Sequence, residues 1–230
     1  MIPLKDNVPT RQFPVVTVGL IIANVLVYFL YQVPDMEASL HDLAFQPCEV
    51  DGSCPVTGED WQVNAFTSMF MHGSIIHLAG NMLFLWIFGN NVEDTMGRVR
   101  YLVFYLLGGL AATALQTWVT LRTGSDAAAQ IPNLGASGAI SAVLGAYFVL
   151  IRHGKVLTAI FLGFIFFLRE IPAMFFLAVY FAFQLWQAGL DFTRPPEGGG
   201  VAVFAHVGGF VFGIAFAFVF RKRAPLRPAY

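Results

Sequence analysis

The sequence predicts an all-α membrane protein: a single domain over residues 1–230 with six transmembrane helices and both termini in the cytoplasm. The first observation is composition. Hydrophobic residues make up 57% of the chain and charged residues 12%, whereas a soluble domain has about 45–50% and about 25%. A chain of this size leaves roughly a third of its surface exposed after folding, so it cannot bury this much apolar side chain in one core. Lipid is therefore the main solvent, and a disordered chain, a nucleic-acid module and a disulfide-stabilised miniprotein are excluded.

The second observation is the length of the apolar segments. Crossing about 30 Å of hydrocarbon takes about 20 residues. The predicted spans are Val15–Tyr31, Ala65–Gly89, Tyr101–Leu121, Leu134–Ile151, Pro172–Leu190 and Val201–Phe220. A seventh run, 156–168, would reach only about 20 Å as a helix, so we expect it to lie in the membrane interface or to dip back. The first span is too long for a signal-peptide core and lacks a cleavage site, so we expect it to be retained.

The third observation is the distribution of basic residues, which gives the orientation. Six spans place eleven Lys and Arg residues on one side, including the tail 221–230, and only Arg122 and Arg194 on the other. Basic residues collect in cytoplasmic loops, so both termini are expected there. A seventh crossing would put the basic tail outside.

The first loop, residues 33–61, is then expected to face outward. It carries seven acidic residues and no Lys or Arg. Both cysteines, Cys48 and Cys54, lie in it. The alternatives are a disulfide in an oxidising compartment and a metal pair, and the wide spacing with only His41 nearby favours the disulfide.

Polar side chains inside spans are costly in lipid and mark candidate sites. The fourth span is directed inward from its outer end, which places Ser137 about 5 Å below that end. The sixth span has the same direction, and His206 is about 8 Å down. If the second span begins at the polar break 72–74, His77 and Asn81 lie about 6–12 Å down, on one face at i and i+4. These four side chains are therefore predicted to share one depth near the outer surface.

Their chemistry suits acyl transfer. A serine hydroxyl becomes nucleophilic when a histidine accepts its proton. Amides at a helix start, an Asn side chain and an imidazole N–H can stabilise the oxyanion that forms. Neither the fourth nor the sixth span contains an acid, which favours a Ser–His dyad over a triad. Small residues in both spans (Gly138, Ala142 and Gly145; Ala205, Gly209 and Gly213) would allow close helix packing.

Several motifs occur in order along the chain: residues 72–82, residues 89–97, the G-x-S-G at Gly135–Gly138, and residues 205–209 followed by Gly213. On these motifs the sequence resembles the rhomboid intramembrane serine proteases of the bacterial six-transmembrane type. The resemblance implies that Ser137 is the nucleophile and His206 the base, and that His77, Asn81 and the Ser137 amide form the oxyanion hole. It also implies a helix bundle with a water-filled cavity open to the outer side.

The same resemblance implies the partners. The expected substrates are single-pass membrane proteins, cut near the outer ends of their helices, with lipid as the surrounding partner. No cofactor, metal or nucleic acid is expected, and the oligomeric state stays open. The expected location is a bacterial inner membrane, with the active site facing the outer side.

Other positions carry alternatives. His72 either supports the cavity or is a solvated histidine at a span edge, and Gly135 is a second candidate for support. Glu93 is expected to cap a hydrogen-bond network on the cytoplasmic side. Some rhomboids carry an aromatic residue four positions after the nucleophile, stacked on the catalytic histidine. Ser141 stands there in this chain, so His206 is expected to be held by other contacts.

Two other function classes have sequence features of their own. A rhomboid-like pseudoprotease would bind membrane clients without cutting them, and the retained Ser137 and His206 favour the enzyme. A small transporter or channel would show paired intramembrane charges or internal repeats, and the sequence shows neither.

Overall fold

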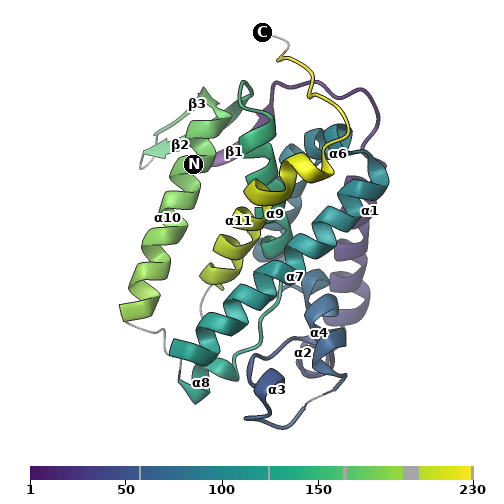
Figure 1. The fold of residues 1–230 in the computed structure, drawn as a ribbon, viewed down its shortest axis with the longest axis vertical. Coiled ribbons are helices and arrows are strands. Elements are labelled where there is room, and N and C mark those ends of the chain that lie inside the picture. The colour runs from purple at the N-terminus through teal and green to yellow at the C-terminus, as the bar shows by residue number, and fades with distance from the viewer. Residues whose placement is uncertain (57, 124, 163–164, 194–201, 229–230) are drawn as a thin grey trace.

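The computed structural model describes the whole chain except residues 57, 124, 163–164, 194–201 and 229–230 (Figure 1). Most of the described chain is helical. In chain order, β1 (Ile2–Asp6) precedes α1 (Val15–Leu26), which continues as π-helix through Val27–Gln32. Next come α2 (Met36–Leu43), α3 (Cys48–Asp51), α4 (Trp61–Thr67), α5 (Ile75–Phe84), a π-helical segment (Leu85–Gly89) and α6 (Asn90–Met96). The chain then forms α7 (Arg98–Thr123), α8 (Asp126–Ala129), α9 (Ser137–Leu150), β2 (Lys155–Leu162), β3 (Ile165–Pro172), α10 (Ala173–Thr193) and α11 (Val203–Phe220).

Four helical stretches among the described residues are long and apolar enough to cross a membrane: Val15–Gln32, Ile75–Met96, Arg98–Thr123 and Val203–Phe220. Helix α9 and the stretch Ala173–Gln187 of α10 are apolar but shorter. The predicted second span begins ten residues later than expected, at Ile75 instead of Ala65, because the chain before it forms the separate helix α4. Ser74 starts the spanning helix by accepting a hydrogen bond from the His77 amide (3.1 Å).

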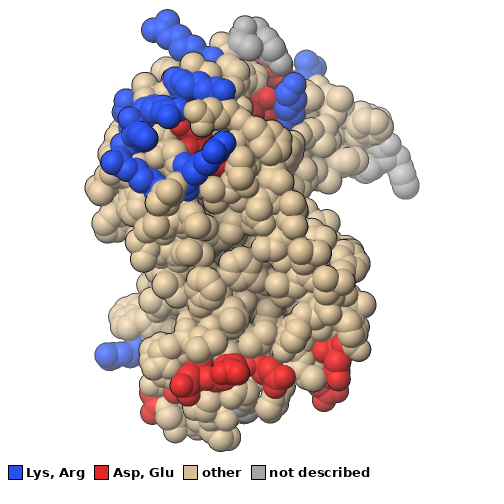
Figure 2. All heavy atoms as spheres, turned by 90° about the vertical axis from the view of Figure 1, so that its right-hand side faces the viewer, with Lys and Arg blue, Asp and Glu red and all other residues tan. Residues whose placement is uncertain are grey.

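Charge is distributed unequally between the two ends of the molecule. Most of the Lys and Arg side chains in view gather at one end, with a few acidic ones among them; most of the Asp and Glu lie at the other end, and a broad belt without charge separates the two (Figure 2). The first, which we call the basic end, is where Arg100 donates to the Arg221 carbonyl. The second, the acidic end, holds α2 and α3 (Figure 1), and here Cys48 and Cys54 form a disulfide as expected. Arg194, one of the two arginines predicted to lie on the outer side, is outside the described residues.

A three-stranded antiparallel sheet contradicts the all-α prediction. Strand β2 pairs with β1 on one edge and with β3 on the other, in the order β1-β2-β3. The run 156–168 thus forms most of a β-hairpin; its residues 163–164 lie outside the described part. Val, Ile, Thr and Phe dominate these strands, and such residues favour extended backbone. Hydropathy alone could not reveal this pairing, because β1 lies some 150 residues away in the sequence.

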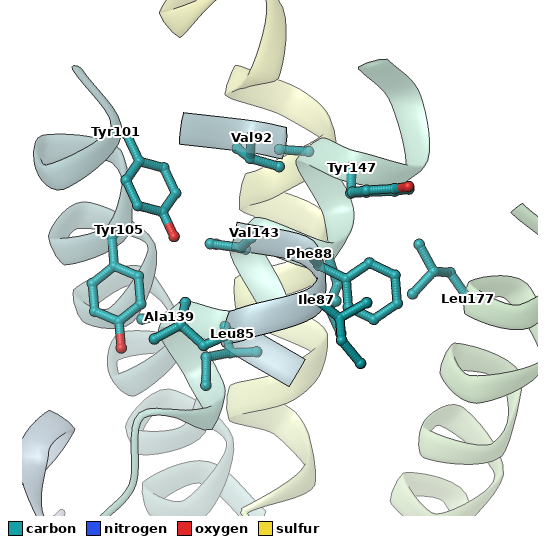
Figure 3. Close-up of a cluster of buried hydrophobic side chains, with 14 of the residues drawn as sticks. Leu85, Ile87, Phe88, Val92, Tyr101, Tyr105, Ala139, Val143, Tyr147 and Leu177 are labelled. Carbon is teal, nitrogen blue, oxygen red and sulfur yellow. The ribbon is translucent and has the colours of Figure 1, made fainter. Parts of the chain in front are cut away.

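Helix α9 forms the centre of the bundle, packed against α7 and α11 (Figure 1). Its small-residue stripe meets that of α11, as predicted. A Cβ atom added at Gly209 would overlap the Gly138 carbonyl, and one at Gly213 would overlap the Ala142 carbonyl. Around α9, the side chains of the second span and of α7 fill the core, and Phe88 packs edge-on against Tyr147 with ring centroids 5.0 Å apart (Figure 3).

Buried acids tie the basic end together. Glu93 accepts hydrogen bonds from the Val16 and Thr17 amides at the start of α1 (3.0 and 2.8 Å), which confirms its expected capping role. Asp94 pairs with Arg11 at 2.7 Å. These contacts hold α6 against the N-terminal segment.

Candidate functional site

A cavity of about 1010 Å³ lies between α5, the segment that precedes α9, and helices α9, α10 and α11. His77, Asn81, Ser137 and His206 all line it. The structure therefore brings together the four side chains that the sequence places at one depth. They come from three different helices, so their meeting is a property of the fold and not of one local motif.

Ser137 is the first residue of α9, and its side chain is half-buried. The first amides of a helix have no partner within that helix, so the Ser137 N–H lies next to its own hydroxyl as a donor. Gly135, two residues earlier, has φ +123°, a backbone conformation that favours glycine. A Cβ at Gly135 would lie 2.8 Å from His77 Cε1 and 3.6 Å from Ser137 Oγ. The missing side chain therefore lets the segment before α9 contact the His77 ring.

His206 lies in the first turns of α11 and is 7% exposed. Its Nδ1 atom is 3.1 Å from Oε1 of Gln184 on α10. Among the described residues no hydrogen bond joins His206 to Ser137, although both line the cavity. Gln184 was missed by the sequence analysis. The signal was present, since Gln184 is a polar residue inside the predicted fifth span.

Asn81 is 8% exposed, and its amide nitrogen has no hydrogen-bond partner among the described residues. A buried N–H group without an acceptor destabilises the fold by about 1–3 kcal/mol. An oxygen atom of a bound ligand would satisfy it. An N–H group on the cavity that no described residue engages is the property expected of an oxyanion donor.

His72 is fully buried, so the interpretation as a solvated histidine is wrong. The Gln32 side chain accepts a hydrogen bond from the His72 amide (2.8 Å) and donates one to its carbonyl (3.2 Å). The His72 ring packs edge-on against the His77 ring, with centroids 5.1 Å apart. The His72 ring thus contacts the His77 ring and helps to hold its orientation.

The described residues contain no group of three or more His, Cys, Asp or Glu side chains able to hold a metal ion. Among the described residues, none of those that line the cavity is Asp, Glu, Lys or Arg. What the arrangement offers is a hydroxyl, two imidazoles, an unpaired amide and a helix start. That set suits proton transfer and oxyanion binding.

Comparison with known proteins gives a consistent result. The family model described as "Rhomboid domain" matches residues 58–223. The human protein "Presenilin-associated rhomboid-like protein, mitochondrial" is 28% identical over 219 residues, which is 90% of this chain and 50% of that protein. "Rhomboid protein 1, mitochondrial" of Saccharomyces cerevisiae is 28% identical over 200 residues, or 86% of this chain and 51% of that protein. "RHOMBOID-like protein 4" of Arabidopsis thaliana is 28% identical over 172 residues, or 75% and 36%.

The chain thus spans about half the length, or less, of these curated relatives. The human and yeast relatives are mitochondrial by name, which does not fit the expected bacterial inner membrane.

Proposed function

The chain belongs to the rhomboid family, and we propose that it is a serine endopeptidase that hydrolyses peptide bonds of transmembrane proteins with a Ser137–His206 dyad. One observation carries the proposal: Ser137, His206, His77 and Asn81 line a single cavity inside an apolar helix bundle. Three helices contribute these polar groups to the interior of the bundle, where apolar side chains would be expected. A packed bundle has no structural need for them.

In the first step the Ser137 hydroxyl attacks the carbonyl carbon of the scissile bond, and His206 accepts its proton through Nε2. Nδ1 is not available for this because Gln184 occupies it. The Ser137 hydroxyl and Nε2 of His206 come within hydrogen-bond distance when substrate binds, since catalytic hydrogen bonds are often long in ligand-free enzymes. The protonated imidazole then donates to the leaving amine, and a water molecule repeats the sequence on the acyl-enzyme.

The tetrahedral intermediate carries a negative oxygen that needs donors. The Asn81 amide, the His77 ring and the Ser137 N–H supply three. Donors fixed before the reaction stabilise developing charge without reorganisation. The Asn81 nitrogen fits this role because no described residue hydrogen-bonds it and it lines the cavity, where it can donate to the oxyanion.

We also propose the six-span topology, with both termini cytoplasmic and the cavity open toward the acidic end. Helix α9 has 14 residues and is about 21 Å long, shorter than the roughly 30 Å of hydrocarbon. If its far end reaches the cytoplasmic boundary, Ser137 lies below the outer boundary, as a site for cleaving membrane-embedded segments requires. The Cys48–Cys54 disulfide indicates that the acidic end faces an oxidising compartment, of which the bacterial periplasm is one example.

The β2–β3 hairpin belongs to the same single domain in this proposal, and it lies in the interfacial layer at the basic end. Ile165 is 71% exposed and Phe166 64%. Such side chains are stable at the level of the lipid headgroups and not in water. A fluorophore on the hairpin, whose depth in the bilayer is measured by its quenching with spin-labelled lipids, should lie less deep when Phe166 is replaced by Glu. Unchanged quenching would contradict this placement.

The proposed activity is tested with a single-pass reporter protein reconstituted with the purified protein in liposomes. The expected result is cleavage by the parent protein and none by Ser137→Ala or His206→Ala, with each variant still folded. Ser53→Ala, which changes an exposed serine of the acidic loop, is the matched control and should cleave at the parent rate. A parent protein that retains the reporter uncut on affinity resin would instead support a client-binding pseudoprotease.

A further inference from the structure

We propose that Gln184 is a positioning residue for His206: it holds the imidazole in the tautomer with hydrogen on Nδ1, so that Nε2 is the free base. This inference rests on the proposed protease function and adds a residue to it. The residue comes from α10, which carries neither the nucleophile nor the base. The dyad is thereby extended to a Ser–His–Gln arrangement.

The contact is buried and short. Gln184 and His206 are each 7% exposed, and Oε1 of the amide lies 3.1 Å from Nδ1 of the ring. A polar pair removed from water to this extent keeps its geometry, because breaking it would leave two unsatisfied groups. The observation does not depend on any surface side chain.

The Tyr180 hydroxyl indicates which end of the amide faces the histidine. Tyr180 lies one turn earlier than Gln184 on α10, and both line the cavity. A carboxamide has one acceptor oxygen and one NH₂ donor group. If the NH₂ group donates to Tyr180, the oxygen is left for His206. An amide oxygen can only accept, so Nδ1 must carry the hydrogen.

The surroundings of His206 explain why an orienting partner is needed. Ser141, one turn after Ser137, lies against α11: a Cβ at Gly209 would be 3.1 Å from the Ser141 Cβ. Ser141 and His206 both line the cavity, and α9 contributes no aromatic ring to its described lining. Among the described residues, Gln184 is the one side chain that hydrogen-bonds the ring.

The orienting group depends on how α10 docks. Phe181, on the same helix, stacks on Phe210 of α11 with ring centroids 4.1 Å apart. This contact holds α10 against the helix that carries the base. A displacement of α10 would separate Gln184 from His206, so the alignment of the base is coupled to the position of α10.

The titratable groups that face His206 are few. His77 on α5 is close enough to interact electrostatically with it, and Tyr180 on α10 lines the same cavity. The described lining contains no carboxylate. Gln184→Glu would therefore place a negative charge beside the ring and stabilise the imidazolium.

Kinetics provide the first test, with the liposome reporter. Gln184→Leu should lower kcat about tenfold or more, because the free energy of one hydrogen bond corresponds to a factor of that size in rate. KM should stay unchanged. Gln184→Glu should restore kcat and move the acidic limb of the pH–rate profile to higher pH, because its carboxylate keeps His206 protonated. Phe183→Leu, a half-exposed position on the same helix, is the control and should match the parent. Parent-like kcat in Gln184→Leu, or an unshifted profile in Gln184→Glu, would overturn the proposal.

Nitrogen NMR of the histidine rings provides a second test that needs no activity. His206 should show hydrogen on Nδ1 in the parent protein and should lose that preference in Gln184→Leu, with His206→Ala identifying its signals. A ring with hydrogen on Nε2 in the parent would overturn the assignment. A parent protein that cleaves nothing but shows hydrogen on Nδ1 would refute the protease function and leave the positioning contact standing.

Discussion

Asp6 is predicted to make the protein less stable as pH rises from 4 to 7. Its carboxylate, 8% exposed in β1, accepts hydrogen bonds from Asn91 (2.6 Å) and from the Tyr147 hydroxyl (2.7 Å). Burial removes water from the charged form and raises the pKa of Asp6 from 3.8 to about 6, even though the hydrogen bond from Tyr147 acts to lower it. The folded protein therefore binds this proton more tightly than the unfolded chain does.

The sign and the size follow from that difference. Well below pH 3.8 both states are protonated, and well above pH 6 neither is. Between these limits the unfolded chain gives up its proton first, so the folded state loses stability as pH rises. The difference between the Asp6 pKa of 3.8 in the unfolded chain and about 6 in the folded protein corresponds to about 3 kcal/mol in the free energy of unfolding.

Unfolding by SDS in mixed micelles, followed by tryptophan fluorescence between pH 2 and 8, measures this effect. Asp6→Asn keeps the shape of the side chain and removes the titration. The difference in unfolding free energy between the parent and Asp6→Asn should therefore change by about 3 kcal/mol across this range, with the variant relatively more stable at pH 7. Parallel profiles for the two proteins would refute the reasoning, because other titrating groups are common to both.

Three further predictions concern the bundle and the cavity. Gly213→Leu should destabilise the fold by about 3 kcal/mol through overpacking against the Ala142 carbonyl, measured by the same unfolding assay. Gly19→Leu, which meets no atom within 4 Å, should change little; equal effects would contradict the packing argument. Gly135→Ala should lower kcat about 100-fold by displacing His77, and parent-like cleavage would show that this approach is unimportant. Asn81→Ala should lower kcat about 100-fold or more with little change in KM; a rise in KM alone would place Asn81 in substrate binding.

Four apolar helices, and the polar side chains that meet in the cavity, could be predicted because each depends on a local property of the sequence. Apolar length revealed the helices, and a polar residue in an apolar span identified Ser137, His77, Asn81 and His206. Small-residue stripes indicated which faces of α9 and α11 meet. In each case the penalty for a misplaced polar group or a bulky side chain is large enough to leave a pattern.

The sheet and the orienting contact could not be predicted in the same way. The sheet joins Ile2 to Ala159, a pairing decided by tertiary structure and not by the hydropathy of either strand. Gln184 stood out as polar within its span, but its partner depends on how α10 rotates against α11. The burial of His72 likewise depends on Gln32, 40 residues earlier, which clamps its backbone.

The central claim is that Ser137 is a nucleophile activated by His206, and covalent labelling tests it most directly. A fluorophosphonate probe acts on activated serines and reports on the nucleophile without a substrate. After incubation of the purified protein in detergent, peptide mass spectrometry should find the probe on Ser137 and nowhere else, with labelling lost in His206→Ala. An unlabelled Ser137 in a folded protein, or labelling that persists in His206→Ala, would contradict the account.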